Sequence, residues 1–198
     1  MTIKLKYDNT NTFFIRGKNE NILIDTGYAG TLQAFYKEIK KNNIRLSDIS
    51  YVIATHYHPD HMGIISELMK LGIKLLLIDI QIEYVNFSND IFFKDKRLNY
   101  APIDTSHAVI INLNDSKEFL NKLGIKGTII HTPSHSDDSI SIILDDKTCF
   151  VGDLEPIEYL NAYKNNQKLL NDWNKILNFN PKIIYYAHIN EKIFWKDE

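Results

Sequence analysis

The chain has 198 residues and a formal charge of −2, and hydrophobic residues make up 44% of it and charged residues 24%. This balance is typical of a folded globular protein that needs no disulfides, so we expect a single domain over residues 1–198. Lysines are dispersed among acidic residues and no apolar run approaches the roughly 20 residues that cross a bilayer, so we expect a cytoplasmic protein without a nucleic-acid or membrane partner.

The first part of the chain predicts an antiparallel start followed by alternating strands and helices. An asparagine-rich turn at residues 8–11 joins the first two strands. Leu32, Phe35, Tyr36 and Ile39 recur at helical spacing, which predicts an amphipathic helix. The expected elements are, in chain order, strands at 3–7, 12–16 and 21–25, a helix at 30–41, a strand at 51–55, a helix at 61–71 and a strand at 74–78.

The stretch from residue 81 to residue 106 has no clear periodicity. Its aromatic residues are scattered among polar ones, at Tyr84, Phe87, Phe92, Phe93 and Tyr100. Two interpretations are open: a lid or substrate-facing insertion, or a packed pair of helices. If the stretch folds across a functional site, its aromatic side chains would form an apolar wall of the substrate pocket.

Regular patterns return in the second half of the chain. The expected elements are a strand at 108–113, a helix at 115–123, a strand at 127–131, a hairpin of strands 139–144 and 148–152, a helix at 167–177 and a strand at 182–187. Strands thus cluster in both halves, with helices able to cover each outer face. Cys149 lies in an apolar strand without a flanking positive group, so we expect a core residue rather than a reactive thiol.

The densest functional signal is the segment Thr55-His56-Tyr57-His58-Pro59-Asp60-His61, which follows a predicted buried strand. In extended backbone His56 and His58 project to the same side. Pro59 stiffens the turn, so that Asp60 and His61 face a neighbouring position. Imidazole and carboxylate ligands suit zinc, manganese or iron, and a segment without cysteine is typical of a catalytic metal site rather than a closed structural zinc site.

Three further residues lie at the ends of predicted strands: His135 in His131-Thr132-Pro133-Ser134-His135, Asp153 after Gly152, and His188 after Tyr185-Tyr186-Ala187. Together with the first segment, they resemble the metallo-β-lactamase fold superfamily, whose members carry His-x-His-x-Asp-His followed by a His, an Asp and a His. Asp25 in Ile24-Asp25-Thr26-Gly27 matches the first, structural aspartate of that family. The resemblance runs from Asp25 to His188, nearly the whole chain.

The resemblance implies an α/β (α+β) protein with a four-layer αββα sandwich and a site for two divalent metal ions at one edge. Zinc is the expected metal, with manganese or iron as alternatives. The implied ligands are His56, His58 and His135 for the first ion, Asp60, His61 and His188 for the second, and Asp153 as a bridge. Asp25 is expected to hydrogen-bond the loop that presents the histidines. His107 and His131 are expected not to be ligands.

The function that this resemblance implies is hydrolysis by a metal-bridging hydroxide, with Asp60 as the catalytic residue that orients it and accepts its proton. The expected substrate is a small-molecule ester, thioester or lactone. A phosphodiesterase of the same fold and mononuclear-iron oxygen or sulfur chemistry, as in the related persulfide dioxygenases, are the alternatives. Antibiotic-hydrolysing members usually lack the bridging aspartate, which argues against a β-lactamase.

Overall fold

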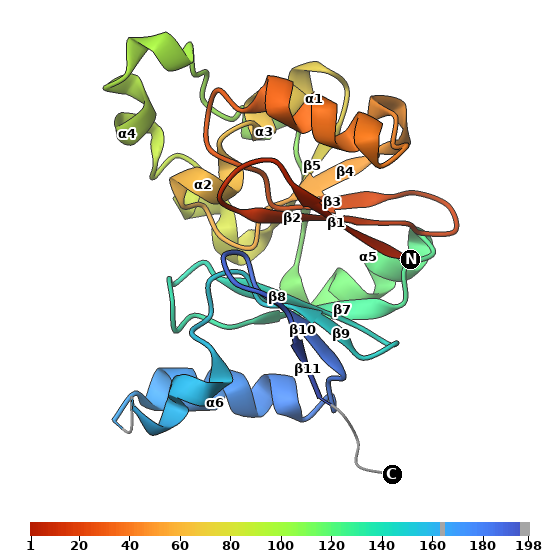
Figure 1. The fold of residues 1–198 in the computed structure, drawn as a ribbon, viewed down its shortest axis with the longest axis vertical. Helices are drawn as coiled ribbons and strands as arrows, with labels where there is room; N and C mark the ends of the chain where they lie inside the picture. Colours follow the sequence, from red (N-terminus) through yellow and green to blue (C-terminus); the bar gives the residue numbers. More distant parts are fainter. Residues whose placement is uncertain (163–164, 195–198) are drawn as a thin grey trace.

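The computed structural model describes residues 1–162 and 165–194, whose strands form two β-sheets (Figure 1). Within these residues the first sheet has six strands in the order β1-β2-β3-β4-β5-β6, and the second has five in the order β11-β10-β9-β8-β7. The strands are β1 (Thr2–Lys6), β2 (Asn11–Ile15), β3 (Ile22–Ile24), β4 (Tyr51–Ile53), β5 (Lys74–Ile78), β6 (Val109–Ile111), β7 (Gly127–His131), β8 (Ile140–Leu144), β9 (Thr148–Phe150), β10 (Ile183–Tyr185) and β11 (Lys192–Ile193).

The helices lie mostly on the outer faces of the sheets. They are α1 (Leu32–Lys41), α2 (Pro59–Met62), α3 (Ile65–Lys70), α4 (Asn89–Phe93), α5 (Ser116–Lys122) and α6 (Gln167–Leu177). Short 3-10 helices connect them at Leu46–Asp48, Asp79–Tyr84, Lys96–Leu98, Thr105–His107, Leu113–Asp115 and Ile157–Asn161. No helix in the described part of the chain has both the length and the apolar character that crossing a membrane requires.

Successive side chains of a strand point to opposite faces of its sheet, and this alternation sets the layers. In β2, Phe13 and Ile15 pack between the two sheets, whereas Phe14 packs with the side chains of α1 and α3. In β9, Phe150 faces the first sheet and Cys149 packs with α6. Figure 1 shows the resulting order, with α1 and α3 above the first sheet and α6 below the second. The predicted αββα sandwich is confirmed.

The direction of the strands decides where the chain's polar loops meet. β1, β2 and β3 are antiparallel, as predicted, and β3 to β6 are parallel. Parallel strands end at the same edge, so Asp25 after β3 and Thr55 after β4 are neighbours. β9 and β10 are also parallel, and the loops that follow them carry Asp153 and His188. These loops converge at one edge of the sandwich.

The single helix predicted over residues 61–71 is wrong, because the chain forms α2 and α3 with a break at Gly63 and Ile64. The Gly63 N–H donates to the carbonyl of Gly27 at 3.1 Å. A Cβ at position 63 would lie 2.2 Å from the backbone nitrogen of Ala29. Glycine is therefore needed where the two backbones touch. The contact fixes α2, which carries Asp60 and His61, against the loop after β3.

The aromatic stretch after β5 does not form the packed helix pair that one interpretation expected. It contains the one-turn helix α4 between 3-10 helices, and α4 projects from the body at the upper left of Figure 1. Phe92 anchors it: the side chain is fully buried, with its ring centroid 5.1 Å from that of Tyr28 and 4.3 Å from that of Tyr100. The other half of the stretch, near Tyr84 and Phe87, borders the site described below.

Cys149 has the core role that the sequence predicts. Its side chain has no exposed surface, and burial raises the pKa of the thiol to about 12. Since the thiolate is the reactive form of cysteine, this residue is chemically inert in the folded chain.

Candidate metal centre

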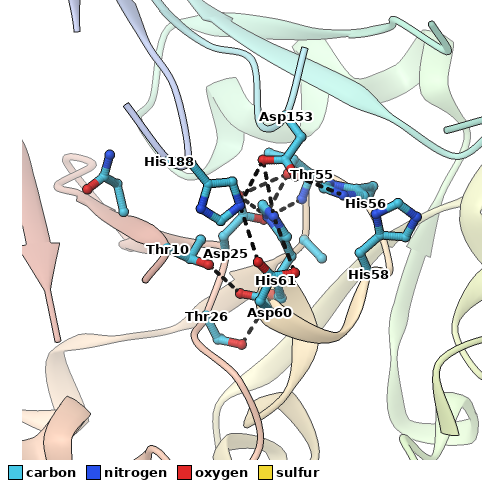
Figure 2. Close-up of polar contacts among 12 residues, drawn as sticks. Thr10, Asp25, Thr26, Thr55, His56, His58, Asp60, His61, Asp153 and His188 are labelled. Atoms are coloured by element: carbon cyan, nitrogen blue, oxygen red, sulfur yellow. Dashed lines mark hydrogen bonds and ion pairs between the residues drawn. The ribbon is translucent and has the colours of Figure 1, made fainter. Parts of the chain in front are cut away.

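All seven side chains predicted as metal ligands gather at the edge where the loops of both sheets converge. Figure 2 labels all of them except His135. Those that could hold one ion within 4.8 Å of one another fall into two groups: His56, His58, His135 and Asp153 in the first, and Asp60, His61 and His188 in the second. The sequence prediction divides the same side chains between two ions, with Asp153 as a bridge instead of a member of the first set. We call the two sets the first and the second ligand group.

Asp153 lies between the histidines of the two groups. One of its carboxylate oxygens faces the histidines of the second group, and the other faces those of the first. Oδ1 lies 3.3 Å from Nε2 of His61 and 3.2 Å from Nε2 of His188. Oδ2 lies 3.8 Å from Nε2 of His56 and 3.6 Å from Nε2 of His135. Such an arrangement suits a carboxylate that gives one oxygen to each of two neighbouring cations.

Buried polar atoms without a hydrogen-bond partner indicate whether these residues fit a metal ion. Nε2 of His56, Nε2 of His61 and Oδ1 of Asp153 are buried without a hydrogen-bond partner. Unpaired buried polar atoms are rare because each carries a desolvation cost. A cation would satisfy all three, and neutral imidazoles with carboxylates are the donors of catalytic zinc, manganese and iron sites. The residues present therefore fit a divalent metal.

Asp25 orients the imidazoles from beneath, without joining either ligand group. Its carboxylate accepts hydrogen bonds from the backbone N–H of Thr55 at 2.6 Å and from the Thr55 hydroxyl, and it lies 3.2 Å from Nδ1 of His61. The hydroxyl lies 3.3 Å from Nδ1 of His56 and, having donated its proton to Asp25, accepts there. These contacts favour a proton on each Nδ1, so that Nε2 is the nitrogen presented to a metal once any proton it carries has left.

Gly152 lets the second sheet approach this support. Its φ is +58°, and a Cβ there would lie 2.6 Å from the Thr55 hydroxyl oxygen. A larger residue would both strain the backbone and push the β9 loop away from β4. The glycine therefore sets the distance between Asp153 and the histidines of the first sheet.

Several side chains that sequence reasoning did not identify hold the ligand loops in place. Asp138 is buried and accepts from the backbone N–H of Tyr57 at 2.7 Å, which ties the loop of His135 to the loop between His56 and His58. Thr10 donates to the carbonyl of Asp60 at 2.7 Å. Similar contacts are made by Asn11 with the carbonyls of Tyr186 and Ile189, and by Asp172 with the N–H of Ser134. Nothing in their local sequence marks these residues, because each contact joins distant segments.

The electrostatics differ between the two groups. Burial lowers the pKa of His56 well below its ordinary value, and burial also lowers the pKa of His135. In the second group, close contacts with the carboxylates of Asp153 and Asp60 raise the pKa of His188 to about 10. Burial alone would lower the pKa of His61, but the carboxylates of Asp25 and Asp153 outweigh it and raise that pKa. The metal-free protein thus holds protons mainly in the second group.

This difference predicts that metal binding releases protons from the second group. At pH 7.5, His61 and His188 are protonated without metal, whereas His56 and His135 are neutral, so loading the site should release about two protons. Affinity for the second ion should therefore rise with pH between 6 and 8. Titration calorimetry in buffers with different ionisation enthalpies measures this number. A release that is unchanged in His188→Gln, or no release at all, would contradict it.

The two remaining histidines lie away from the cluster. Nε2 of His131 is 2.8 Å from the carbonyl oxygen of Asp137, so its ring is already hydrogen-bonded. His107 is exposed and lies 3.8 Å from Asp104. Neither belongs to a ligand group among the described residues.

A histidine and aspartate cluster at the open edge of an αββα sandwich defines a metal-binding protein of this fold. The chain belongs to the metallo-beta-lactamase superfamily, whose sequence model matches residues 5–188. The fold agrees: a metallo-beta-lactamase family protein from Thermus thermophilus superposes with a TM-score of 0.71 at 17% identity, covering 97% of this chain and 74% of that one.

Two curated relatives extend the comparison to named activities. A probable metallo-hydrolase of Methanocaldococcus jannaschii is 31% identical over 140 residues, which is 69% of this chain and 63% of the relative. An atrochrysone carboxyl ACP thioesterase of Emericella nidulans is 25% identical over 174 residues, which is 82% of this chain and 47% of the relative. The chain thus spans about half to two thirds of the length of these relatives.

Proposed function

We propose that the chain is a dinuclear metal-dependent hydrolase that acts on a small-molecule thioester, with esters and lactones as related substrates. The observation that carries the dinuclear part is the position of Asp153, which offers one oxygen to each ligand group. Resemblance to a metallo-hydrolase and to a thioesterase supports hydrolysis of an acyl group. Zinc is the proposed metal, since imidazole and carboxylate donors suit it, and manganese or iron would suit them too.

Two divalent cations held by these groups would lower the pKa of water and polarise the carbonyl under attack. Asp60 lies beside them, with Oδ2 3.2 Å from Nε2 of His188. Burial raises the pKa of Asp60, but the hydrogen bond with His188 and the charges of His61 and His188 together outweigh burial and lower it. The ionised carboxylate can therefore orient the attacking water and take its proton. Water oxygen joins the carbonyl carbon, the C–S bond breaks, and the sulfur leaves as a thiolate, which becomes a thiol on receiving the proton that Asp60 took from water.

The walls of the site favour an uncharged substrate. One cavity of about 220 Å³ adjoins the site and is lined by His135, Gly152, Asp153, Leu154, Glu155, Pro156, Tyr186, His188 and Ile189. A second, of about 250 Å³, is lined by Tyr57, His58, Tyr84, Phe87, Ser136, Asp137 and Asp138. Neither lining contains lysine or arginine, and both contain carboxylates, so apart from the proposed metal ions an anionic phosphodiester would meet no lysine or arginine to hold it. A phosphodiesterase is therefore the second candidate.

Elemental analysis and a hydrolysis screen test the proposal. Protein purified without added metal is expected to carry about two equivalents of zinc or manganese and to hydrolyse thioesters, esters or lactones faster than bis-p-nitrophenyl phosphate. Removal of metal with a chelator should abolish the activity, and added metal should restore it. One equivalent of iron would favour the mononuclear oxygen or sulfur chemistry instead. A protein that binds no metal even when it is added would refute the mechanism.

A further inference from the structure

We propose that Tyr84 and Phe87 form an acyl subsite beside His58, which selects thioesters whose acyl group is an apolar chain. The inference rests on the proposed function and names the substrate class of the same site. Its starting point is the cavity of about 250 Å³ that these two aromatic side chains share with His58. Because His58 belongs to the first ligand group, a chain in this cavity would end at the reacting centre.

Phe87 is unusually exposed for an aromatic residue. It is 78% exposed, more than any other aromatic side chain in the described part of the chain. Single exposed apolar residues are ordinary on protein surfaces, but this one lines a cavity that contains a candidate metal ligand. Contact with an apolar part of a ligand would remove that surface from water, which is favourable in proportion to the area covered.

The segment that carries Tyr84 and Phe87 is fastened at both ends to the ligand loops. Before Tyr84, the buried Gln81 amide donates to the carbonyls of Ala54 and Asp138, each at 3.1 Å. After Phe87, the buried Ser88 hydroxyl donates to the carbonyl of Tyr57 at 2.7 Å. Tyr57 stands between His56 and His58, so these bonds set the aromatic segment directly against the site. A subsite held in this way loses little conformational entropy when a ligand binds.

The remaining wall of the cavity explains why the chain should be apolar. Both carboxylate oxygens of Asp138 already accept hydrogen bonds, one from the Tyr57 N–H and one from the Ser136 hydroxyl. Asp137 is exposed and lies 3.4 Å from Nζ of Lys168. No cation in the lining could bind an acyl group that carries its own carboxylate. At about 250 Å³ the cavity is smaller than the roughly 300 to 1,000 Å³ of drug-sized ligand sites, so it suits a short or medium chain.

The other cavity, of about 220 Å³, leaves room for the thiol part of the substrate. It borders His188, and Figure 2 shows His188 and His58 on opposite sides of Asp153. An acyl chain against Phe87 and a thiol toward His188 would place the carbonyl carbon between them, over the two ligand groups. The two cavities then correspond to the two products of thioester hydrolysis.

A chain-length series tests the subsite. The substrates are acetyl, butyryl, hexanoyl and octanoyl thioesters of N-acetylcysteamine, with kcat/KM measured for metal-loaded protein. Wild type should gain at least about 10-fold from acetyl to hexanoyl. Phe87→Ala should reduce this gain to about threefold or less, and Phe87→Leu should restore part of it.

Phe93→Ala is the matched control, because Phe93 is also exposed and on the same segment but does not line the cavity. It should show the wild-type preference, and all variants should bind as much metal as wild type. A preference for long chains that persists in Phe87→Ala, or no preference in wild type, would overturn the acyl subsite while the hydrolase stands. A wild type that cleaves none of the thioesters would overturn the proposed thioesterase and the subsite together.

Discussion

Asp153→Ala is expected to lower bound metal from about two equivalents to at most one and to slow hydrolysis by more than about 100-fold. The substitution removes the one carboxylate whose oxygens face both ligand groups, at 3.2 Å from His188 and 3.6 Å from His135. Loss of a residue that only supports a ligand typically costs about 10- to 100-fold, so loss of a shared ligand should exceed that range. Elemental analysis and kcat/KM on the same preparation measure both effects.

Asp137→Ala provides the control for this result. Its carboxylate is exposed, lines the neighbouring cavity and belongs to neither ligand group among the described residues. It should retain about two equivalents of metal. Asp153→Asn adds a finer comparison, because an amide keeps the shape but loses the charge that two cations share. If Asp153→Ala still bound as much metal as wild type, the two groups would not share this residue, and the dinuclear proposal would be wrong.

The candidate ligands could be predicted from the sequence because they are concentrated in one segment and follow the order of a family pattern. Four of the seven, from His56 to His61, lie in one turn after a buried strand, where local rules of strand geometry apply. Asp153 and His188 were found only through the family pattern, since an aspartate after a glycine is a common turn pair. Their proximity depends on β9 and β10 running parallel, which the residues themselves do not encode locally.

What the sequence did not predict depends on contacts between distant segments. The break between α2 and α3 lies where Gly63 contacts the loop near Gly27. In the sequence these two glycines are separated by α1 and β4. Asp138 likewise supports the site by reaching the N–H of Tyr57 in another sheet's loop. The aromatic stretch had no periodicity because tertiary anchors, such as Gln81 and Ser88, fix it instead of a regular hydrogen-bond pattern. Such contacts become visible only when both partners are placed in space.

Asp25→Asn is expected to weaken metal binding by about 10- to 100-fold without abolishing it. Asp25 holds Nδ1 of His61 at 3.2 Å and, through the Thr55 hydroxyl, supports His56. An amide removes the negative charge that fixes the His61 proton on Nδ1, so the imidazole would present its Nε2 lone pair less often. Metal dissociation constants from competition with a chromophoric chelator measure the change.

Comparison with Asp25→Ala separates two roles of Asp25: orienting the imidazoles for metal binding and stabilising the local backbone. Asp25 has a φ of +60°, a conformation that asparagine tolerates and alanine adopts at a cost of roughly 1–2 kcal/mol. Alanine also leaves the buried N–H of Thr55 without its acceptor, so thermal unfolding of the metal-free protein should show a larger loss of stability than in Asp25→Asn. Both variants should nevertheless lose metal affinity, because both lack the charge beside His61. Wild-type affinity in Asp25→Asn would mean that packing alone orients His61, and that the carboxylate serves only the fold.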